Sequence, residues 1–169
     1  MANSTFSGPV RSENGFKSVS KNSSTGAVTE IITYGEAPVA LADGNVSLTN
    51  ATHSGRVLIV PDGGQDNTYS LPSPVAGSSF QFVYGGLAAD ATDFIIDSGS
   101  NTNYFIGNVA FNDTDDGAAS VVFPDGNSNS KLQVNVPGSA IINVVAKDST
   151  NWYVWGSVTG ATAPAFADQ

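Results

Sequence analysis

The residues that could carry out chemistry are few. The chain has one histidine, His53, and no cysteine. His53 lies in the turn-like stretch Asn50-Ala-Thr-His-Ser-Gly55, and no Gly-x-Ser-x-Gly elbow is present to expose a serine nucleophile. General acid–base and nucleophilic catalysis both need convergent groups with tuned proton affinities. The sequence therefore predicts that His53 is a loop or interface residue and that the protein is not an enzyme.

Paired carboxylates are another possible source of catalysis, because glycoside hydrolysis uses two acids held about 5 to 9 Å apart. Of the fifteen acidic residues only three are glutamates. Among the aspartates, Asp62, Asp125 and Asp148 occupy turn positions, where Asp caps the local backbone. These positions favour turn formation over a catalytic pair.

The acidic run Asn112-Asp113-Thr-Asp115-Asp116-Gly117 is the best metal candidate, because it crowds hard oxygen ligands into one loop, as Ca²⁺ requires. An EF-hand loop beginning at Asp113 would end in a glutamate, but Pro124 stands at that position. We therefore predict no cofactor and no metal, with Asp113, Asp115 and Asp116 as the alternative cation ligands.

Charge and composition exclude several classes of partner. The chain has six basic and fifteen acidic residues, for a net charge of −9, and the basic residues are scattered along the sequence. Binding to phosphates needs a concentrated cationic surface, so we expect no nucleic-acid partner. No stretch approaches the roughly 20 apolar residues of a membrane span, and residues 1–26 lack the apolar segment of a signal peptide. We expect a chain made in the cytoplasm, without a membrane partner.

Short apolar or alternating segments recur from Val28 onward, and Gly, Pro, Asn and Asp clusters separate them. Examples are Arg56–Val60 and Ser79–Tyr84. Strands spaced about 8 to 12 residues apart, with turn residues between them, are typical of sandwiches and barrels. We predict an all-β fold, with a β-sandwich or jelly-roll-like body over residues 27–158, no strand before Val28, and one possible helix at Leu87–Ala91.

Two halves of this body resemble each other. Val57-Leu-Ile-Val-Pro61-Asp-Gly63 parallels Ser120-Val-Val-Phe123-Pro124-Asp-Gly126, and Asn103-Tyr-Phe-Ile-Gly107 parallels Asn151-Trp-Tyr-Val-Trp-Gly156. In each Pro-Asp-Gly triplet, Pro presets φ, Asp caps the turn and Gly takes the positive φ, so we predict hairpin corners. Two similar units packed face to face would form a sandwich.

Aromatic residues concentrate in the alternating segments, at Phe80, Phe82, Tyr84, Tyr104, Phe111, Trp152, Tyr153 and Trp155. One face of an alternating strand must be buried, and aromatic residues are favoured cross-strand partners, so most of these should belong to the core. Adjacent strand residues point to opposite faces, so Tyr153 or Trp155 should be exposed. Exposed aromatic rings could stack against sugars.

The two ends of the chain differ from the body. Residues 1–26 form a polar arm in which Phe6, Val10 and Phe16 follow neither the helical nor the strand period, so the arm cannot bury them itself. Fully extended, it could reach roughly 80 Å at about 3.3 Å per residue. The tail 159–169 has no strand pattern and one isolated aromatic residue, Phe166. Both ends could contact neighbouring subunits, and the alternative for each is a frayed terminus.

The opening run Ser4-Thr-Phe-Ser-Gly-Pro-Val10 resembles the N-termini of structural proteins from tailed bacteriophages. In the body, Gly77-Ser-Ser-Phe80, Gly138-Ser-Ala-Ile-Ile142 and Trp152-Tyr-Val-Trp155-Gly156 resemble segments of small β-domains in phage particles. This order of an N-terminal run followed by strand and turn segments covers almost the whole chain. It is shared between capsid decoration (cement) proteins, tail-fibre domains and tailspikes.

The resemblance to capsid decoration proteins implies a virion structural protein on the outer surface of the phage head. It implies a homotrimer that binds several subunits of the major capsid protein at once and stabilises the shell through avidity. The expected contact residues are Phe6, Pro9, Val10, Arg11, Phe16 and Phe166, with Arg11 facing an acidic group of the coat. The alternative is a receptor- or glycan-binding module of a tail fibre or adhesin, which would use its exposed aromatic residues or the Asp113–Asp116 loop.

Overall fold

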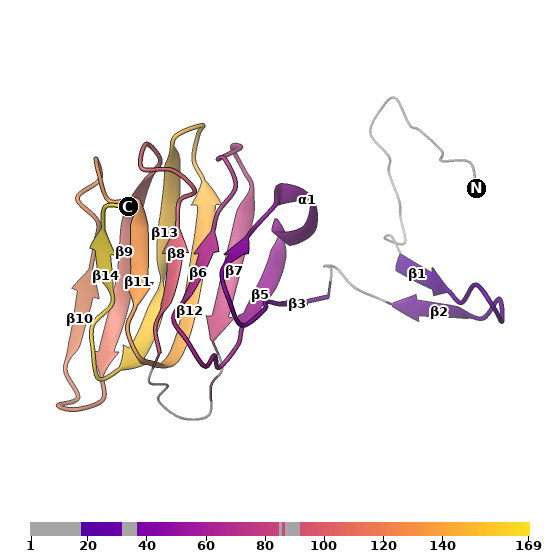
Figure 1. Cartoon of the computed structure of the whole chain (residues 1–169), viewed down its shortest axis with the longest axis horizontal. Helices are drawn as coiled ribbons and strands as arrows, with labels where there is room; N and C mark the ends of the chain where they lie inside the picture. The colour runs from indigo at the N-terminus through magenta and orange to yellow at the C-terminus, as the bar shows by residue number, and fades with distance from the viewer. Residues whose placement is uncertain (1–17, 32–36, 85, 87–91) are drawn as a thin grey trace, which may run out of the picture. The chain divides into compact units, whose positions relative to one another are not determined.

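The structure, a computed structural model, describes residues 18–31, 37–84, 86 and 92–169 (Figure 1). The chain divides into two compact units, residues 1–36 and residues 37–169. Several predictions concern residues outside the described ones: the contact residues Phe6, Pro9, Val10, Arg11 and Phe16, and the possible helix at Leu87–Ala91.

The first unit contains an antiparallel hairpin of β1 (Ser18–Lys21) and β2 (Val28–Ile31). Its loop is closed by Asn22, whose Oδ1 accepts hydrogen bonds from the amides of Ser24 and Thr25. The prediction that no strand begins before Val28 is wrong, because the Asn22–Gly26 segment is a hairpin turn and brings β1 into register with β2.

The second unit contains two sheets and one short helix, α1 (Asn50–His53). The seven-stranded sheet has the order β10-β9-β13-β12-β7-β5-β3. Its strands are β3 (Val39–Ala40), β5 (Arg56–Val60), β7 (Ser79–Tyr84), β9 (Tyr104–Asp113), β10 (Ala119–Val122), β12 (Pro137–Ala146) and β13 (Asn151–Gly160). The five-stranded sheet has the order β14-β11-β8-β6-β4. Its strands are β4 (Val46–Ser47), β6 (Asn67–Ser70), β8 (Phe94–Asp97), β11 (Lys131–Val134) and β14 (Ala165–Ala167).

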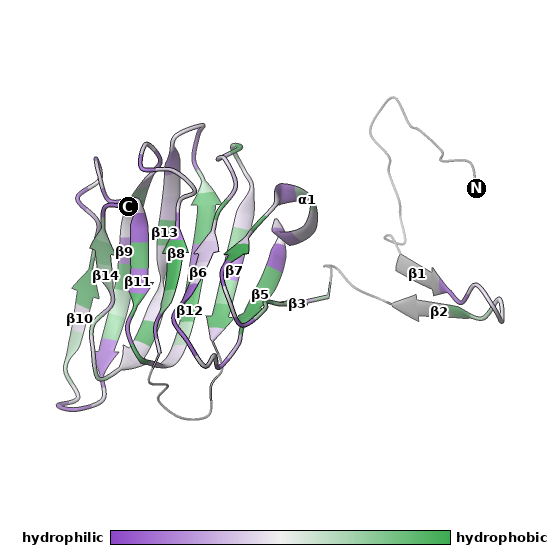
Figure 2. Cartoon of the chain, in the orientation of Figure 1, coloured by the Kyte–Doolittle hydropathy of each residue, from purple (hydrophilic) through white to green (hydrophobic). Residues whose placement is uncertain are grey.

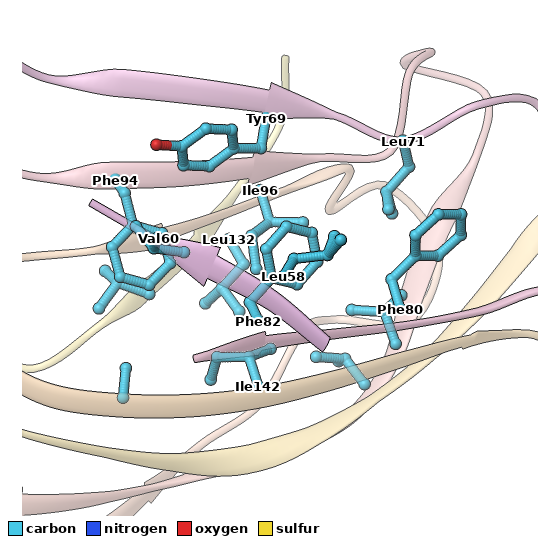
Figure 3. Packing of buried hydrophobic residues seen from close by; sticks show 14 of the residues in the cluster. Leu58, Val60, Tyr69, Leu71, Phe80, Phe82, Phe94, Ile96, Leu132 and Ile142 are labelled. Carbon is cyan, nitrogen blue, oxygen red and sulfur yellow. The ribbon is translucent and has the colours of Figure 1, made fainter. Parts of the chain in front are cut away.

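The core lies between these two sheets, which confirms the predicted all-β sandwich (Figures 1 and 3). Alternation along the strands produces it: in β7, Phe80, Phe82 and Tyr84 are buried and the residues between them are half-buried. Rings from opposite sheets meet, with centroids 6.3 Å apart for Tyr69 and Phe82. Such a pair contributes about 0.5–1.5 kcal/mol beyond its buried area.

From β3 to β8 the chain changes sheet with every strand, so odd-numbered strands lie in one sheet and even-numbered strands in the other. As a result β5 lies parallel to both β3 and β7, and β6 lies parallel to both β4 and β8. A parallel pair needs a crossover connection, and here a strand of the opposite sheet supplies it. These strands form three turns of a flattened coil, which we call the coil; an all-antiparallel jelly roll has no such connections.

Face-to-face packing of the two sequence-related halves would require each half to form its own sheet. The structure differs from this expectation. β5 and its counterpart β10 both belong to the seven-stranded sheet, whereas β6 and β11, the strands that follow them, both belong to the five-stranded sheet. The related strands β9 and β13 are parallel neighbours. Each half therefore contributes strands to both layers. The Pro-Asp-Gly segments are accordingly corners between sheets, not hairpin corners.

The C-terminal tail also contains a strand that the sequence did not predict. β14 pairs with β11, and Phe166 packs against the core with its ring 6.1 Å from that of Phe105. The predicted contact residue Phe166 is thus half-buried within its own subunit, because pairing of β14 with β11 turns the ring inward. Among the described residues, no helix has the length and apolar character needed to cross a bilayer.

Candidate functional site

A shallow hollow of about 250 Å³ lies on the seven-stranded sheet. Its lining includes Arg56 and Val57 of β5, Gln81 of β7, Asn143 and Val145 of β12, and Trp155 of β13. In the strand register Val57 lies opposite Gln81, Gln81 opposite Asn143, and Asn143 opposite Trp155. These four residues alternate with the buried residues of their strands, so they form one row on the face of the sheet that points away from the core.

Trp155 provides the aromatic wall of the hollow. Its side chain is 47% exposed, whereas Trp152, three positions earlier on the same strand, is fully buried. Tyr153 is also exposed, at 43%, and lies on the same outer face but outside the hollow. The prediction that Tyr153 or Trp155 would be exposed is therefore confirmed for both, and the prediction of a buried role for Phe80, Phe82, Tyr84, Phe111 and Trp152 is confirmed as well.

Two amide side chains form the floor of the hollow. Gln81 Nε2 donates a hydrogen bond of 2.9 Å to Asn143 Oδ1. Within the described part of the chain, no hydrogen bond engages Gln81 Oε1 or Asn143 Nδ2. An amide group offers one acceptor oxygen and two donor hydrogens. The pair therefore holds one acceptor and one amino group in fixed positions beside the indole of Trp155.

Arg56 is held at the rim of the hollow by backbone carbonyl groups. Its Nε and one terminal nitrogen donate to the oxygen of Ala37, at 3.0 and 2.6 Å, and the other terminal nitrogen donates to the oxygen of Thr52 at 3.1 Å. A guanidinium group anchored at three nitrogens has a fixed orientation. It provides a positive charge beside the uncharged row but is not part of the row, because Arg56 lies opposite Phe80 in the strand register.

A second notable surface is the edge strand β10. It pairs with β9 on one side only. Ala119, Ser120 and Val121 are exposed, Val121 at 55%, and Phe123 directly after the strand is exposed at 72%. Figure 2 shows β10 as mostly hydrophobic. No charged residue lies between Asp116 and Asp125.

The other edges of the two sheets in the second unit are better protected. β3 and β4 have two residues each, and β14 has three, flanked by Pro164 and Asp168. Short length, proline and charge are the usual devices that prevent an edge from pairing with another chain. β10 is the longest of these edge strands and has neither proline nor charge within its four residues.

The candidate catalytic and metal-binding residues make local hydrogen bonds to the backbone. His53 Nδ1 accepts a hydrogen bond of 3.0 Å from the Thr49 amide at the start of α1. Asp113 Oδ1 accepts from the Asp115 amide and Asp116 Oδ1 from the Ala118 amide, at 2.8 and 2.7 Å. Among the described residues, no three His, Asp or Glu side chains come together in a way that could hold a metal. The Asp113–Asp116 loop is a capped turn between β9 and β10.

Two turn aspartates have strongly lowered pKa values. The hydroxyl of Ser128, followed by the amides of Asn127, Ser128 and Asn129, lowers the pKa of Asp125 well below its usual range. The amide of Thr150, followed by the side chain of Asn151, does the same for the pKa of Asp148. Hydrogen bonds to the ionised form favour that form, so neither carboxyl group is suited to act as a general acid near neutral pH.

Sequence reasoning found Trp155 but missed its partners in the hollow. Gln81 and Asn143 are separated by 62 positions and meet only because β12 inserts beside β7. The chain matches no family model, and no curated protein matches it.

Proposed function

We propose that this chain is a capsid decoration protein, a structural component that binds the outer surface of a phage head and stabilises it. The resemblance of its opening and of its strand segments to phage structural proteins supports the class. The unprotected β10 edge, with Val121 and Phe123 exposed, supports docking onto another protein and is the observation on which the proposal depends.

The mode of docking follows from the chemistry of a free edge. An exposed edge strand presents unpaired backbone amides and carbonyls, and an extended segment of a partner can add to it as a further strand. Main-chain hydrogen bonds supply affinity, while pockets for alternate side chains supply selectivity. We assign this role to an extended segment of the major capsid protein, with Phe123 as the apolar anchor beside the added strand.

Several weak contacts would act together on a shell. A homotrimer would present three copies of β10 and three N-terminal segments at once. Linked contacts can raise the overall affinity by roughly 10²–10⁴-fold without any new type of contact, provided that the geometry allows simultaneous engagement. The proposed role is mechanical stabilisation of the shell. The aspartates that cap turns are consistent with this structural role.

The first experiment is quantitative mass spectrometry of purified particles from the phage that encodes the chain. Abundance near that of the major capsid protein is the expected result. An abundance of a few per cent would place the chain on the tail and overturn the decoration role, and absence from particles would do the same. Light scattering of the purified chain tests the homotrimer.

The second experiment tests the edge directly. Val121→Lys places a charge in the middle of β10, which should block strand addition because a lysine on an edge disfavours further pairing. Val75→Lys is the matched control, since Val75 is 58% exposed but lies in the β6–β7 connection. We expect V121K to lose binding to shells assembled from the major capsid protein and V75K to retain it. Equal binding by both variants would remove β10 as the docking edge.

A further inference from the structure

We infer that the hollow around Trp155 binds a neutral pyranose sugar. This activity goes beyond the decoration role and does not rest on it, because the hollow spans β5, β7, β12 and β13, whereas the proposed docking edge is β10 at the margin of the sheet. A particle component built this way would hold the shell with its edge and contact saccharides with its outer face.

The indole of Trp155 supplies the first element of sugar recognition. Sugar rings carry flat patches of C–H groups, and an aromatic face offers them an apolar, electron-rich surface. Nearly half of the Trp155 side chain remains exposed, although the core of the same body buries Trp152 completely. A large aromatic ring left open beside a hollow, rather than on a flat surface, is the arrangement that stacking requires.

The amide pair supplies the second element. A pair of adjacent sugar hydroxyls can accept from one group and donate to another, and the floor of the hollow offers both: the amino group of Asn143 donates, and Gln81 Oε1 accepts. Their mutual hydrogen bond of 2.9 Å holds the two groups in place before any sugar arrives. Because the two amide side chains are already ordered, sugar binding would cost less conformational entropy than binding to freely rotating side chains.

Size and charge narrow the class of sugar. A hollow of about 250 Å³ lies below the roughly 300–1,000 Å³ typical of drug-sized ligands, so one ring fits it better than a long buried chain. The walls formed by Val57 and Val145 are apolar, and the floor is uncharged.

Saturation-transfer difference NMR with the full-length chain tests the proposal, using the methyl glycosides of glucose, galactose, mannose and N-acetylglucosamine as probes. We expect saturation transfer to the ring C–H protons of at least one of the four. No transfer to any of them, at millimolar concentrations, would overturn the proposal.

Two variants test whether the glycoside binds in the hollow. Trp155→Ala should weaken binding of the responding glycoside by about two- to twelvefold, the factor that corresponds to the loss of one stacking interaction. Tyr153→Ala is the matched control, because it removes an equally exposed aromatic residue two positions away that does not line the hollow. Equal weakening in both variants, or in neither, would contradict the assignment.

A measurement on the unaltered chain removes any dependence on the folding of the variants. Trp152 is buried and Trp155 is exposed, so acrylamide should quench chiefly the fluorescence of Trp155. The responding glycoside should reduce that quenching, and unchanged quenching at saturation would overturn the proposal. V121K should still bind the glycoside, so failure of the docking edge and failure of the sugar site would be distinguished.

Discussion

The amide nitrogen of Val136 lies 3.0 Å from Oδ1 of Asp93, and this hydrogen bond holds a β-branched residue at a φ of 36°. Among the described residues, no other residue except glycine has a positive φ. The second oxygen of Asp93 accepts from Gln133 Nε2 at 2.7 Å. One carboxylate thus clamps the connection between β11 and β12, and the backbone there stores strain of about 1–3 kcal/mol.

Relief of this strain can be measured. Val136→Gly should leave the free energy of unfolding unchanged or raise it by up to about 1 kcal/mol, because the strain relieved exceeds the extra chain entropy of glycine. Asp93→Ala should lower it by about 1–3 kcal/mol, since two hydrogen bonds are lost. Urea unfolding provides both values. Val134→Gly, a change at a fully buried neighbour, should cost far more than V136G, and a similar cost would show that position 136 is not strained.

Gly156 permits the close approach of β12 and β13. A Cβ at this position would lie 2.0 Å from the backbone oxygen of Ile141, which a strand in the middle of the sheet cannot move away. Gly156→Ala should therefore destabilise the body by about 1–3 kcal/mol, as overpacking does. Thermal unfolding measures the change, with Ser157→Ala on the same strand as control. An unaltered melting temperature for G156A would mean that the two strands can separate without cost.

Acid should weaken the turns closed by Asp125 and Asp148. Both folded-state pKa values are lowered, so their contribution to stability is fully present above the unfolded value of about 4 and is lost as pH falls through the folded pKa. Denaturant titrations at a series of pH values should show stability falling below about pH 4. A D125N/D148N double variant should show a smaller fall, and an identical pH dependence would contradict this origin.

The second unit should fold without the first. Every residue of the buried core cluster lies between Leu41 and Val158, with Phe166 packed against it, and so within residues 37–169. Deletion of residues 1–36, which keeps the Ala37 carbonyl bound by Arg56, should leave the melting temperature nearly unchanged. Differential scanning calorimetry measures it. If the deletion also weakens shell binding, the proposed contact role of the arm is supported, whereas unchanged binding would count against it.

The sequence was most informative where a property depends on neighbours along one strand. Alternation correctly separated buried Phe82 from its half-buried neighbours, and it separated buried Trp152 from exposed Tyr153. It could not assign strands to sheets, because pairing depends on residues far apart in the chain. β14 was missed for this reason: Ala165-Phe-Ala167 has little strand character of its own and is ordered by β11.

The same limit applies to the candidate site. Trp155 stood out as an exposed aromatic residue, but Gln81 and Asn143 were ordinary polar residues in two separate strand patterns. Only the register of β7 and β12 brings them together. The hairpin of β1 and β2 was missed for a different reason, since the side chain of Asn22 closes a turn in a segment that otherwise lacks strand character.

The insertion of β12 beside β7 also has a consequence for how the protein is made. The coil is complete once β8 has been synthesised, yet β7 at its margin has no partner on its open side until β12 follows. A growing chain therefore carries an apolar strand with one unpaired edge through much of its synthesis, which is when such edges are most exposed to aggregation. Efficient production of the protein should depend on how quickly the ribosome translates the segment between Tyr84 and Pro137.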